Sequence, residues 1–246
     1  MDRMIFIAMS GAKEAMSAQA LNSNNLANAG TTGFRSDFHT SLSQQVYGPG
    51  HPSRVYATAQ EGGADFNKGS IISTGRELDM AINGDGWFAV QATDGSEAYT
   101  RAGDFHIDTL GRLKNSAGNV VLGNNGPVSI PQHASINFGA DGTISIQPLG
   151  DTPETMVVLD RIKLVNPPID QLQKGKDGLM RLENAQPTRP DAKISIISGS
   201  LEQSNVNSVT SMVKMIELAR SYEAHIKLMR AAEDNDKAAA QIIQMS

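Results

Sequence analysis

The chain has 246 residues with a formal net charge of −5, and 39% of its residues are hydrophobic. This length is enough for one large domain or two small ones with a buried core. The negative charge and the lack of a basic block argue against nucleic-acid binding. The absence of cysteine excludes disulfides, thiolate zinc sites and a cysteine nucleophile.

No apolar run approaches the roughly 18 residues that a membrane-spanning helix needs. The short apolar run Met4–Met9 is followed closely by Lys13 and Glu14. A secretion signal needs a longer apolar region followed by a small-residue cleavage site. We therefore expect neither a cleaved signal peptide nor membrane insertion.

Residues 1–29 predict a helix. Apolar or small residues recur at Ile5, Ala8, Ala12 and then Ala15 or Met16, which is the spacing of one helical face. The face is narrow and rich in alanine, so it favours close packing against a second helix over a large buried area.

The end of this helix carries four asparagines, Asn22, Asn24, Asn25 and Asn28, before the turn Gly30–Gly33. Asparagine is a poor helix former because its amide competes for backbone hydrogen bonds. A helix C-terminus explains the glycines but not the three earlier amides. Because an amide both donates and accepts, we favour a polar interlock between subunits, with a simple cap as the alternative.

The middle of the chain is rich in turns. Residues 34–78 predict an extended, partly irregular connector, and residues 79–202 predict a mainly-β domain of sandwich or barrel type. Turn sequences such as TDG, SAG and ADG separate the expected strands. These strands are 87–91, 97–101, 104–108, 112–115, 120–123, 128–131, 135–138, 143–147, 156–165, 179–183 and 193–199.

A second, longer helix is expected from about Asn205 to Ile243, with Asn205, Asn207 or Ser208 as its N-cap. Steps of three and four residues typical of a coiled coil link Met212, Met215, Ala219, Tyr222, Ile226 and Met229, and the pattern resumes at Ala240 and Ile243.

Neither terminal helix has a core of its own, so the expected fold is α+β. The two helices pair as a coiled coil (1–33 with 203–246), and the β domain is inserted between them. Isolated helices of this kind are marginal, so we expect them to become ordered on assembly.

No catalytic residue, metal ligand or cofactor is predicted. Ser10 and Lys13 match S-x-x-K, but the other motifs of those acyl-transfer enzymes are missing, so a helix-surface pair is favoured. The stretch Asn83–Trp87 fits a hairpin turn better than a calcium loop. Trp87 is expected to anchor the β core, with a binding platform as the alternative.

Three separated motifs resemble the flagellar basal-body rod and hook proteins. They are "SNNLANAGTTGFR" (23–35), "ELDMAINGDGWFAV" (77–90) with "YTRAGDF" (99–105), and "GSLEQSNVNSVTSMVKMIELARSYEAHIKLM" (199–229). Their order and their spread over most of the chain make the resemblance specific.

The resemblance implies a structural subunit without enzymatic activity, in the periplasmic rod of the flagellar basal body. It implies export through the flagellar type III apparatus, helical assembly with copies of itself and other rod proteins, and transmission of torque. The short connector resembles that of a proximal rod subunit, with a distal rod subunit as the alternative. An exported ligand-binding or adhesin-like β module, using Trp87, is the alternative of a different class.

The expected subunit interface combines the N-terminal motif with the stripe of the second helix. Its residues are Asn22, Asn24, Asn25, Leu26, Asn28, Thr32, Gly33, Phe34, Arg35, Asn205, Met212, Met215, Ile216, Ala219, Tyr222, Ile226 and Met229.

Overall fold

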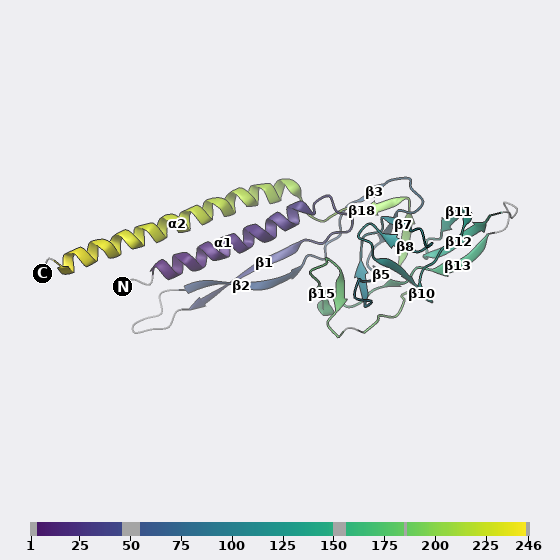
Figure 1. The fold of residues 1–246 in the computed structure, drawn as a ribbon, viewed down its shortest axis with the longest axis horizontal. Coiled ribbons are helices and arrows are strands. Elements are labelled where there is room, and N and C mark those ends of the chain that lie inside the picture. The colour runs from purple at the N-terminus through teal and green to yellow at the C-terminus, as the bar shows by residue number, and fades with distance from the viewer. Residues whose placement is uncertain (1–3, 46–54, 150–155, 185, 245–246) are drawn as a thin grey trace. The chain divides into compact units, whose positions relative to one another are not determined.

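The computed structural model describes residues 4–45, 55–149, 156–184 and 186–244 and divides into two compact units (Figure 1). The helical unit comprises residues 1–29, 37–65 and 206–246. The β unit comprises residues 30–36 and 66–205. The ends of the predicted terminal domain and residues 46–54 of the predicted connector lie outside the described residues.

Both expected helices are confirmed, as α1 (Met4–Ala27) and α2 (Ser208–Gln244). They lie side by side and antiparallel (Figure 1), because Asn22 near the end of α1 bonds to Ser211 near the start of α2. Further along, a Cβ added to Gly11 would lie 2.4 Å from the His225 ring, so the lack of a side chain there lets the helices approach. The buried face of α1 is Ala8, Ala12, Ala15, Ala18, Asn22 and Asn25.

The expected stripe of α2 is correct only in part. Met215, Ala219, Ile226 and Met229 are partly buried, together with Leu218 and His225, and Ala232 is buried. Met212 is 54% exposed and lies outside this packed face. On α1, Ala15 faces inward and Met16 is 64% exposed. Small residues on α1 and larger ones on α2 therefore make the contact between the helices.

An antiparallel hairpin of β1 (Asp37–Gln45) and β2 (Val55–Ala64) completes the helical unit. It packs along α1, where Glu14 Oε1 and His39 Nε2 lie 3.2 Å apart. The sequence indicates no strand here because β1 reads DFHTSLSQQ and is mostly exposed. Without an alternation of buried and exposed residues, the period-2 signal is lost.

A nine-stranded sheet dominates the β unit, with strand order β15-β16-β6-β5-β9-β8-β7 and with β10 on β9 and β14 on β5. The bounds are β5 (Trp87–Gln91), β6 (Glu97–Thr100), β7 (Phe105–Ile107), β8 (Leu113–Asn115), β9 (Val120–Gly123), β10 (Gly126–Pro127), β14 (Leu164–Val165), β15 (Leu172–Lys174) and β16 (Met180–Leu182).

The described part of the β unit also contains three smaller sheets. They are β11 (His133–Phe138), β12 (Thr143–Pro148) and β13 (Val157–Arg161); β4 (Met80–Asn83) with β17 (Ser195–Ser198); and β3 (Ile71–Ser73) with β18 (Ser200–Glu202). A short 3₁₀ helix, Ile169–Gln171, precedes β15.

One hydrophobic core joins the nine-stranded sheet, the three-stranded sheet and the β4–β17 pair. At its centre the rings of Phe88 and Phe105 meet edge to face, with centroids 5.2 Å apart. Sequence-predicted strands such as 87–91 and 120–123 are confirmed, whereas 128–131 is wrong because β10 already ends at Pro127.

Of the two forms expected for the β domain, sandwich or barrel, the barrel is wrong. Within the described residues the two end strands of the large sheet, β15 and β7, do not pair with each other. Strands of two to five residues are too short to carry the tilt and stagger that closure requires.

Candidate functional site

Three segments of the β unit stand next to segments of the helical unit in the sequence. They are residues 30–36, the residues that begin at 66 and the residues that end at 205. They meet at the carboxylate of Glu202. Oε1 accepts hydrogen bonds from Arg35 Nη2 at 2.5 Å and from the backbone N–H of Gly69 at 3.0 Å. Oε2 accepts from Arg101 Nη1 at 2.9 Å. We call Gly33, Arg35, Gly69, Arg101 and Glu202 the junction cluster.

The junction cluster buries two guanidinium groups around one carboxylate. The side chains of Arg35, Arg101 and Glu202 are only 1%, 4% and 2% exposed. Burial lowers the pKa of Arg101, with a smaller opposing effect from the charge of Glu202. Removing the carboxylate would leave two cations without their shared counter-charge, which is costly in a protein interior.

Trp87 lies against both arginines. Its ring centroid is 5.8 Å from Arg35 Cζ and 5.4 Å from Arg101 Cζ, which is cation–π distance. Phe66 packs edge-on against the same ring. Because Trp87 is only 4% exposed, it is buried as expected and does not form an exposed binding platform, but it packs against the arginines beside the main hydrophobic cluster, which contains Phe88.

The N-terminal motif enters this cluster through its backbone. Gly33 has φ +65° and donates its N–H to the Glu202 carbonyl at 2.8 Å. Lys174 Nζ lies 4.0 Å from the Phe34 ring centroid and donates to the Arg35 carbonyl. Asn205 Oδ1 accepts from the Ser36 N–H, and its Nδ2 donates to the Asn67 carbonyl. The first and last motifs of the sequence are thus bonded to each other.

The asparagines of α1 form hydrogen bonds inside this chain. Asn22 Nδ2 donates to the Ser211 carbonyl at 2.8 Å, and Asn28 Nδ2 donates to the Asn24 carbonyl at 2.9 Å. Asn25 both donates to the Asp37 carbonyl at 2.9 Å and accepts from the Asp37 N–H at 3.0 Å. The side chain of Asn24 is exposed, and Leu26 is partly buried, as is Thr32. A role of these amides between subunits stays a prediction.

Changing Asn25 to aspartate is expected to destabilise the helical unit by about 1–3 kcal/mol. The carboxylate keeps the acceptor for the Asp37 N–H but loses the donor and faces the Asp37 carbonyl. Thermal unfolding followed by circular dichroism at 222 nm measures the loss. Asn24→Asp, at an exposed position one residue earlier, is the control and should change stability by less than about 0.5 kcal/mol.

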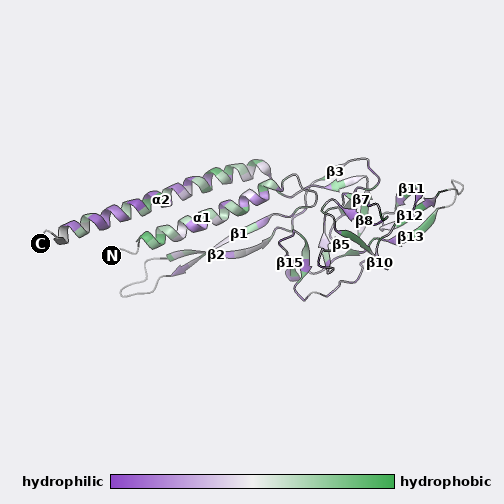
Figure 2. Cartoon of the chain, viewed as in Figure 1, coloured by the Kyte–Doolittle hydropathy of each residue, from purple (hydrophilic) through white to green (hydrophobic). Residues whose placement is uncertain are grey.

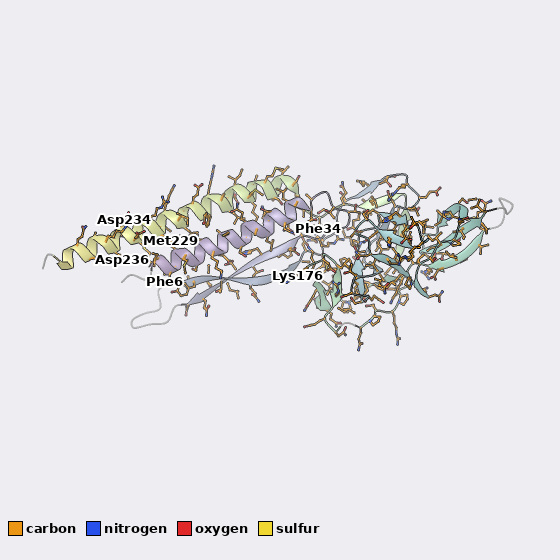
Figure 3. All side chains as sticks on the ribbon, viewed as in Figure 1. Phe6, Phe34, Lys176, Met229, Asp234 and Asp236 are labelled. Carbon is orange, nitrogen blue, oxygen red and sulfur yellow. The ribbon has the colours of Figure 1, made fainter. Side chains whose placement is uncertain are left out.

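Apolar residues remain exposed on both helices. On α2 they are Val209, Met212, Val213 and Ile216, and on α1 they are Phe6, Met9 and Met16. Figure 2 shows hydrophobic and hydrophilic residues interspersed along both helices, and Figure 3 shows Phe6 and Met229 towards the same end of the pair. Clustered exposed apolar residues usually mark a surface that another protein covers. Tyr222 is 36% exposed and lies at the margin of the packed face.

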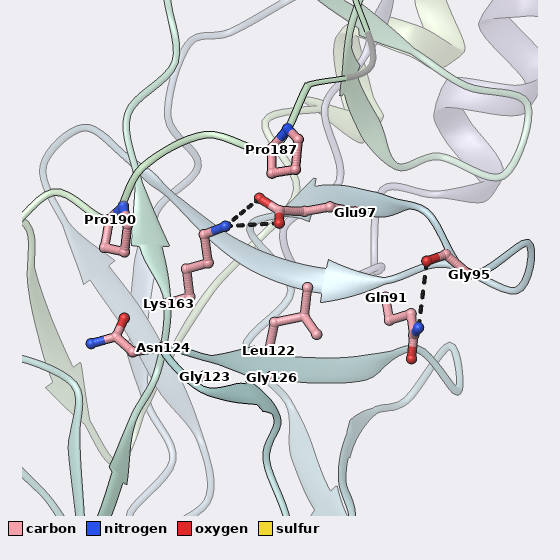
Figure 4. A pocket seen from close by; sticks show the side chains of 10 residues that line it. All are labelled: Gln91, Gly95, Glu97, Leu122, Gly123, Asn124, Gly126, Lys163, Pro187 and Pro190. Carbon is pink, nitrogen blue, oxygen red and sulfur yellow. Dashed lines mark hydrogen bonds and ion pairs between the residues drawn. The ribbon is translucent and has the colours of Figure 1, made fainter.

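The β unit also has a hollow of about 430 Å³ over β5, β6 and β9 (Figure 4). Its charged lining residues, Lys163 and Glu97, bond to each other at 2.7 and 2.8 Å. Glu97 also accepts from the hydroxyl of Tyr99, whose pKa is raised chiefly by burial. These charges neutralise each other, so the hollow offers no unpaired charge to a ligand.

The structure gives no separate chemical role to the S-x-x-K stretch. The Ser10 hydroxyl donates to the Ile7 carbonyl at 2.8 Å within α1. Among the described residues there is no cluster of three potential metal ligands. None of the helices in the described part of the chain is both long and apolar enough to cross a membrane.

Sequence reasoning missed Arg101 and Glu202 as central residues. Both stand within the quoted motifs, but a charged residue in a turn-rich segment normally indicates solvent. The available signal is that Arg35, Arg101 and Glu202 each fall in a different motif.

Two family models match the chain. One describes the flagellar hook protein FlgE/F/G D1 domain and matches residues 81–146. The other describes the C-terminal part of flagellar basal body rod FlgEFG proteins and matches residues 197–242.

Full-length relatives show the same similarity. The flagellar basal-body rod protein FlgF of Escherichia coli K12 is 40% identical, and that of Salmonella typhimurium is 39% identical, over 100% of both chains in each pair. The rod protein FlgG of Bacillus subtilis is 30% identical over 94% of this chain and 96% of its own.

Proposed function

We propose a more specific function for this chain from one premise. The premise is that the chain belongs to the family of flagellar basal-body rod proteins and is a structural component of the rod. The proposal is that it serves as a proximal rod subunit in the periplasm. The observation that carries it is the similarity to FlgF proteins at 39–40% identity over the full length, above the 30% found with a FlgG protein.

We further propose that the subunit assembles helically with copies of itself and with other rod proteins, after export through the flagellar type III apparatus. The terminal segments, 1–33 with 203–246, would form the assembly domain, in which α1 and α2 act as a coiled coil. The connector 34–78 would lead to an outer domain, 79–202. The exposed apolar residues of α1 and α2 support this division of roles, because assembly would cover them.

The proposed interface contains the seventeen residues of the N-terminal motif and the α2 stripe named above. Among its hydrophobic members, Met212 and Ile216 are the most exposed in a single chain, at 54% each. Buried members such as Asn22, Asn25 and Arg35 would act indirectly, by holding the exposed members in place.

The junction cluster supports a role in carrying torque. The segments that contain Gly33, Gly69 and Glu202 each lie close in the sequence to a segment of the helical unit. Hydrogen bonds to Glu202 from the N–H groups of Gly33 and Gly69 join these segments. A load that reaches the β unit through any one of them is therefore shared with the others.

Changing Ile216 to glutamate is expected to reduce incorporation into basal bodies at least about tenfold, because a charge at a desolvated interface costs more than 1.4 kcal/mol. Immunoblots of isolated basal bodies and swimming assays in a strain lacking the natural copy measure this effect. Lys214→Glu, also exposed but directed to another side of α2, should incorporate normally. Normal rods and motility without any copy of this chain would refute the proposed function.

A further inference from the structure

One polar contact joins the β1–β2 hairpin to α1 inside the helical unit. His39 Nε2 on β1 and Glu14 Oε1 on α1 lie 3.2 Å apart, and each side chain is 13% exposed. Both atoms are shielded from solvent, and among the described residues neither has a hydrogen-bond partner beyond the atom that it faces. The interaction between these two atoms therefore decides whether the contact attracts or repels.

The proton on the imidazole sets the sign of this interaction. Without a hydrogen on Nε2, two acceptor atoms face each other where water cannot separate them, which is unfavourable. With a hydrogen there, Nε2 donates to the carboxylate, and the bond is strongest when the ring also carries a positive charge. A free imidazole loses that charge at about pH 6.5, and a free glutamate carboxyl is ionised above about pH 4.3. The attraction should therefore be present at mildly acidic pH and weaken as the pH rises.

Other ionisable groups near the pair come from α1 and β2. On α1, Lys13 lines the same hollow as Glu14. On β2, Tyr56 lines that hollow, and Glu61 is the register partner of His39. One further cation and one further acidic residue thus stand near the pair, and their effects on the charge of the imidazole oppose each other.

A second histidine, on α2, has the opposite behaviour. The ring of His225 packs against Gly11 of α1, one turn before Glu14, and lines the hollow beside the hairpin. Its Nδ1 is shielded from solvent and lacks a hydrogen-bond partner among the described residues. A positive charge on His225 would thus be buried without an acceptor, which is costly. Acid therefore favours the contact of the hairpin with α1 and disfavours that of α2 with α1, so separate variants are needed.

From this arrangement we propose that the Glu14–His39 pair is a pH-dependent latch. It holds the β1–β2 hairpin on α1 at mildly acidic pH, and the hold weakens as His39 becomes neutral. The base of the hairpin stays attached at either pH, because Asn25 bonds to the backbone of Asp37 through a neutral amide. The latch therefore changes how firmly the hairpin beyond His39 is docked. This property of the folded chain does not depend on the proposed rod function.

A double-mutant cycle tests the latch in the full chain. The natural chain, Glu14→Gln, His39→Gln and the double variant are unfolded thermally at about pH 5.5 and about pH 8, and circular dichroism follows the loss of helix. We expect His39→Gln to lower the midpoint temperature by about 4 °C more at the lower pH than at the higher one. In the Glu14→Gln background this difference should disappear, because the carboxylate that attracts the charge is gone.

Two controls separate the pair from the other histidines. His106→Gln, at an exposed position of β7, should shift the midpoint equally at both pH values. In a His225→Gln background, the extra loss that His39→Gln causes at the lower pH should persist. Hydrogen exchange, corrected for the intrinsic effect of pH, locates the change. Amides of β1 in the natural chain should lose protection at least about threefold at the higher pH, whereas amides of β5 should not.

Three results would overturn the inference. One is a loss for His39→Gln that is the same at both pH values. Another is a pH-dependent loss that persists without the Glu14 carboxylate, since the charge of the imidazole would then act through a different group. The third is a chain that shows no cooperative loss of helix at either pH, because the latch requires a folded helical unit.

Discussion

Replacing Glu202 by glutamine is expected to destabilise the β unit by about 3–5 kcal/mol. The change preserves the volume of the side chain, so no cavity confuses the result. It removes the carboxylate that Arg35 and Arg101 share, while both guanidinium groups stay almost fully buried. Denaturant unfolding of the full chain, followed by tryptophan fluorescence, measures the loss. Trp87 is the only tryptophan and lies against both arginines, so its signal reports this part of the molecule.

Two further variants separate charge from other effects. Glu77→Gln, at an exposed position of the β unit, should change stability by less than about 0.5 kcal/mol. The triple variant Arg35→Met, Arg101→Met and Glu202→Leu should recover much of the loss, because an apolar replacement leaves no buried charge. A loss below about 1 kcal/mol for Glu202→Gln would mean that the buried charges find other compensation.

The success of sequence reasoning varied between elements for identifiable physical reasons. Both helices were predictable because residues such as Ala8, Ala12 and Ala15 repeat at helical spacing over a long segment. Strands such as Trp87–Gln91 were predictable because they are apolar and bounded by turn residues. The β1–β2 hairpin was not, because its polar residues show no alternation.

The junction cluster illustrates a different limit. The distance in sequence from Arg35 to Glu202 is 167 residues, and that from Arg101 to Glu202 is 101. The local sequence pattern indicates whether a residue suits a helix or a strand. It does not indicate which distant residue will neutralise the charge of a buried side chain. The resemblance to a family located all three residues in motifs without explaining why they are charged. The structure supplies the reason, since two arginines need one common carboxylate.

The two buried asparagines at the end of α1 make their hydrogen bonds inside this chain. Asn22 and Asn25 are committed to backbone groups of Ser211 and Asp37 in the same chain. Their amides therefore fix the position of α1 against α2 and the hairpin within one chain. If these amides act inside the chain, the specificity of the proposed assembly would come from their exposed neighbours.

Changing Gly33 to alanine is expected to cost about 2–4 kcal/mol, for two additive reasons. The residue has φ +65°, where a Cβ is strained, and that Cβ would lie 2.3 Å from the Arg101 carbonyl carbon and 2.4 Å from the Ala102 nitrogen. Backbone atoms cannot rotate away as a side chain can, so the turn must move and the bond from the Gly33 N–H to Glu202 is strained. Fluorescence of Trp87 during denaturant unfolding measures the loss.

Gly30 provides a matched control for this substitution, only three residues earlier in the same motif. A Cβ at Gly30 meets no atom within 4 Å, and its φ lies outside the positive range. Gly30→Ala should therefore be neutral or stabilise the protein by up to about 1 kcal/mol through the lower entropy of the unfolded chain. If both alanine variants unfolded alike, the close approach of Gly33 to Arg101 would not be what the motif requires.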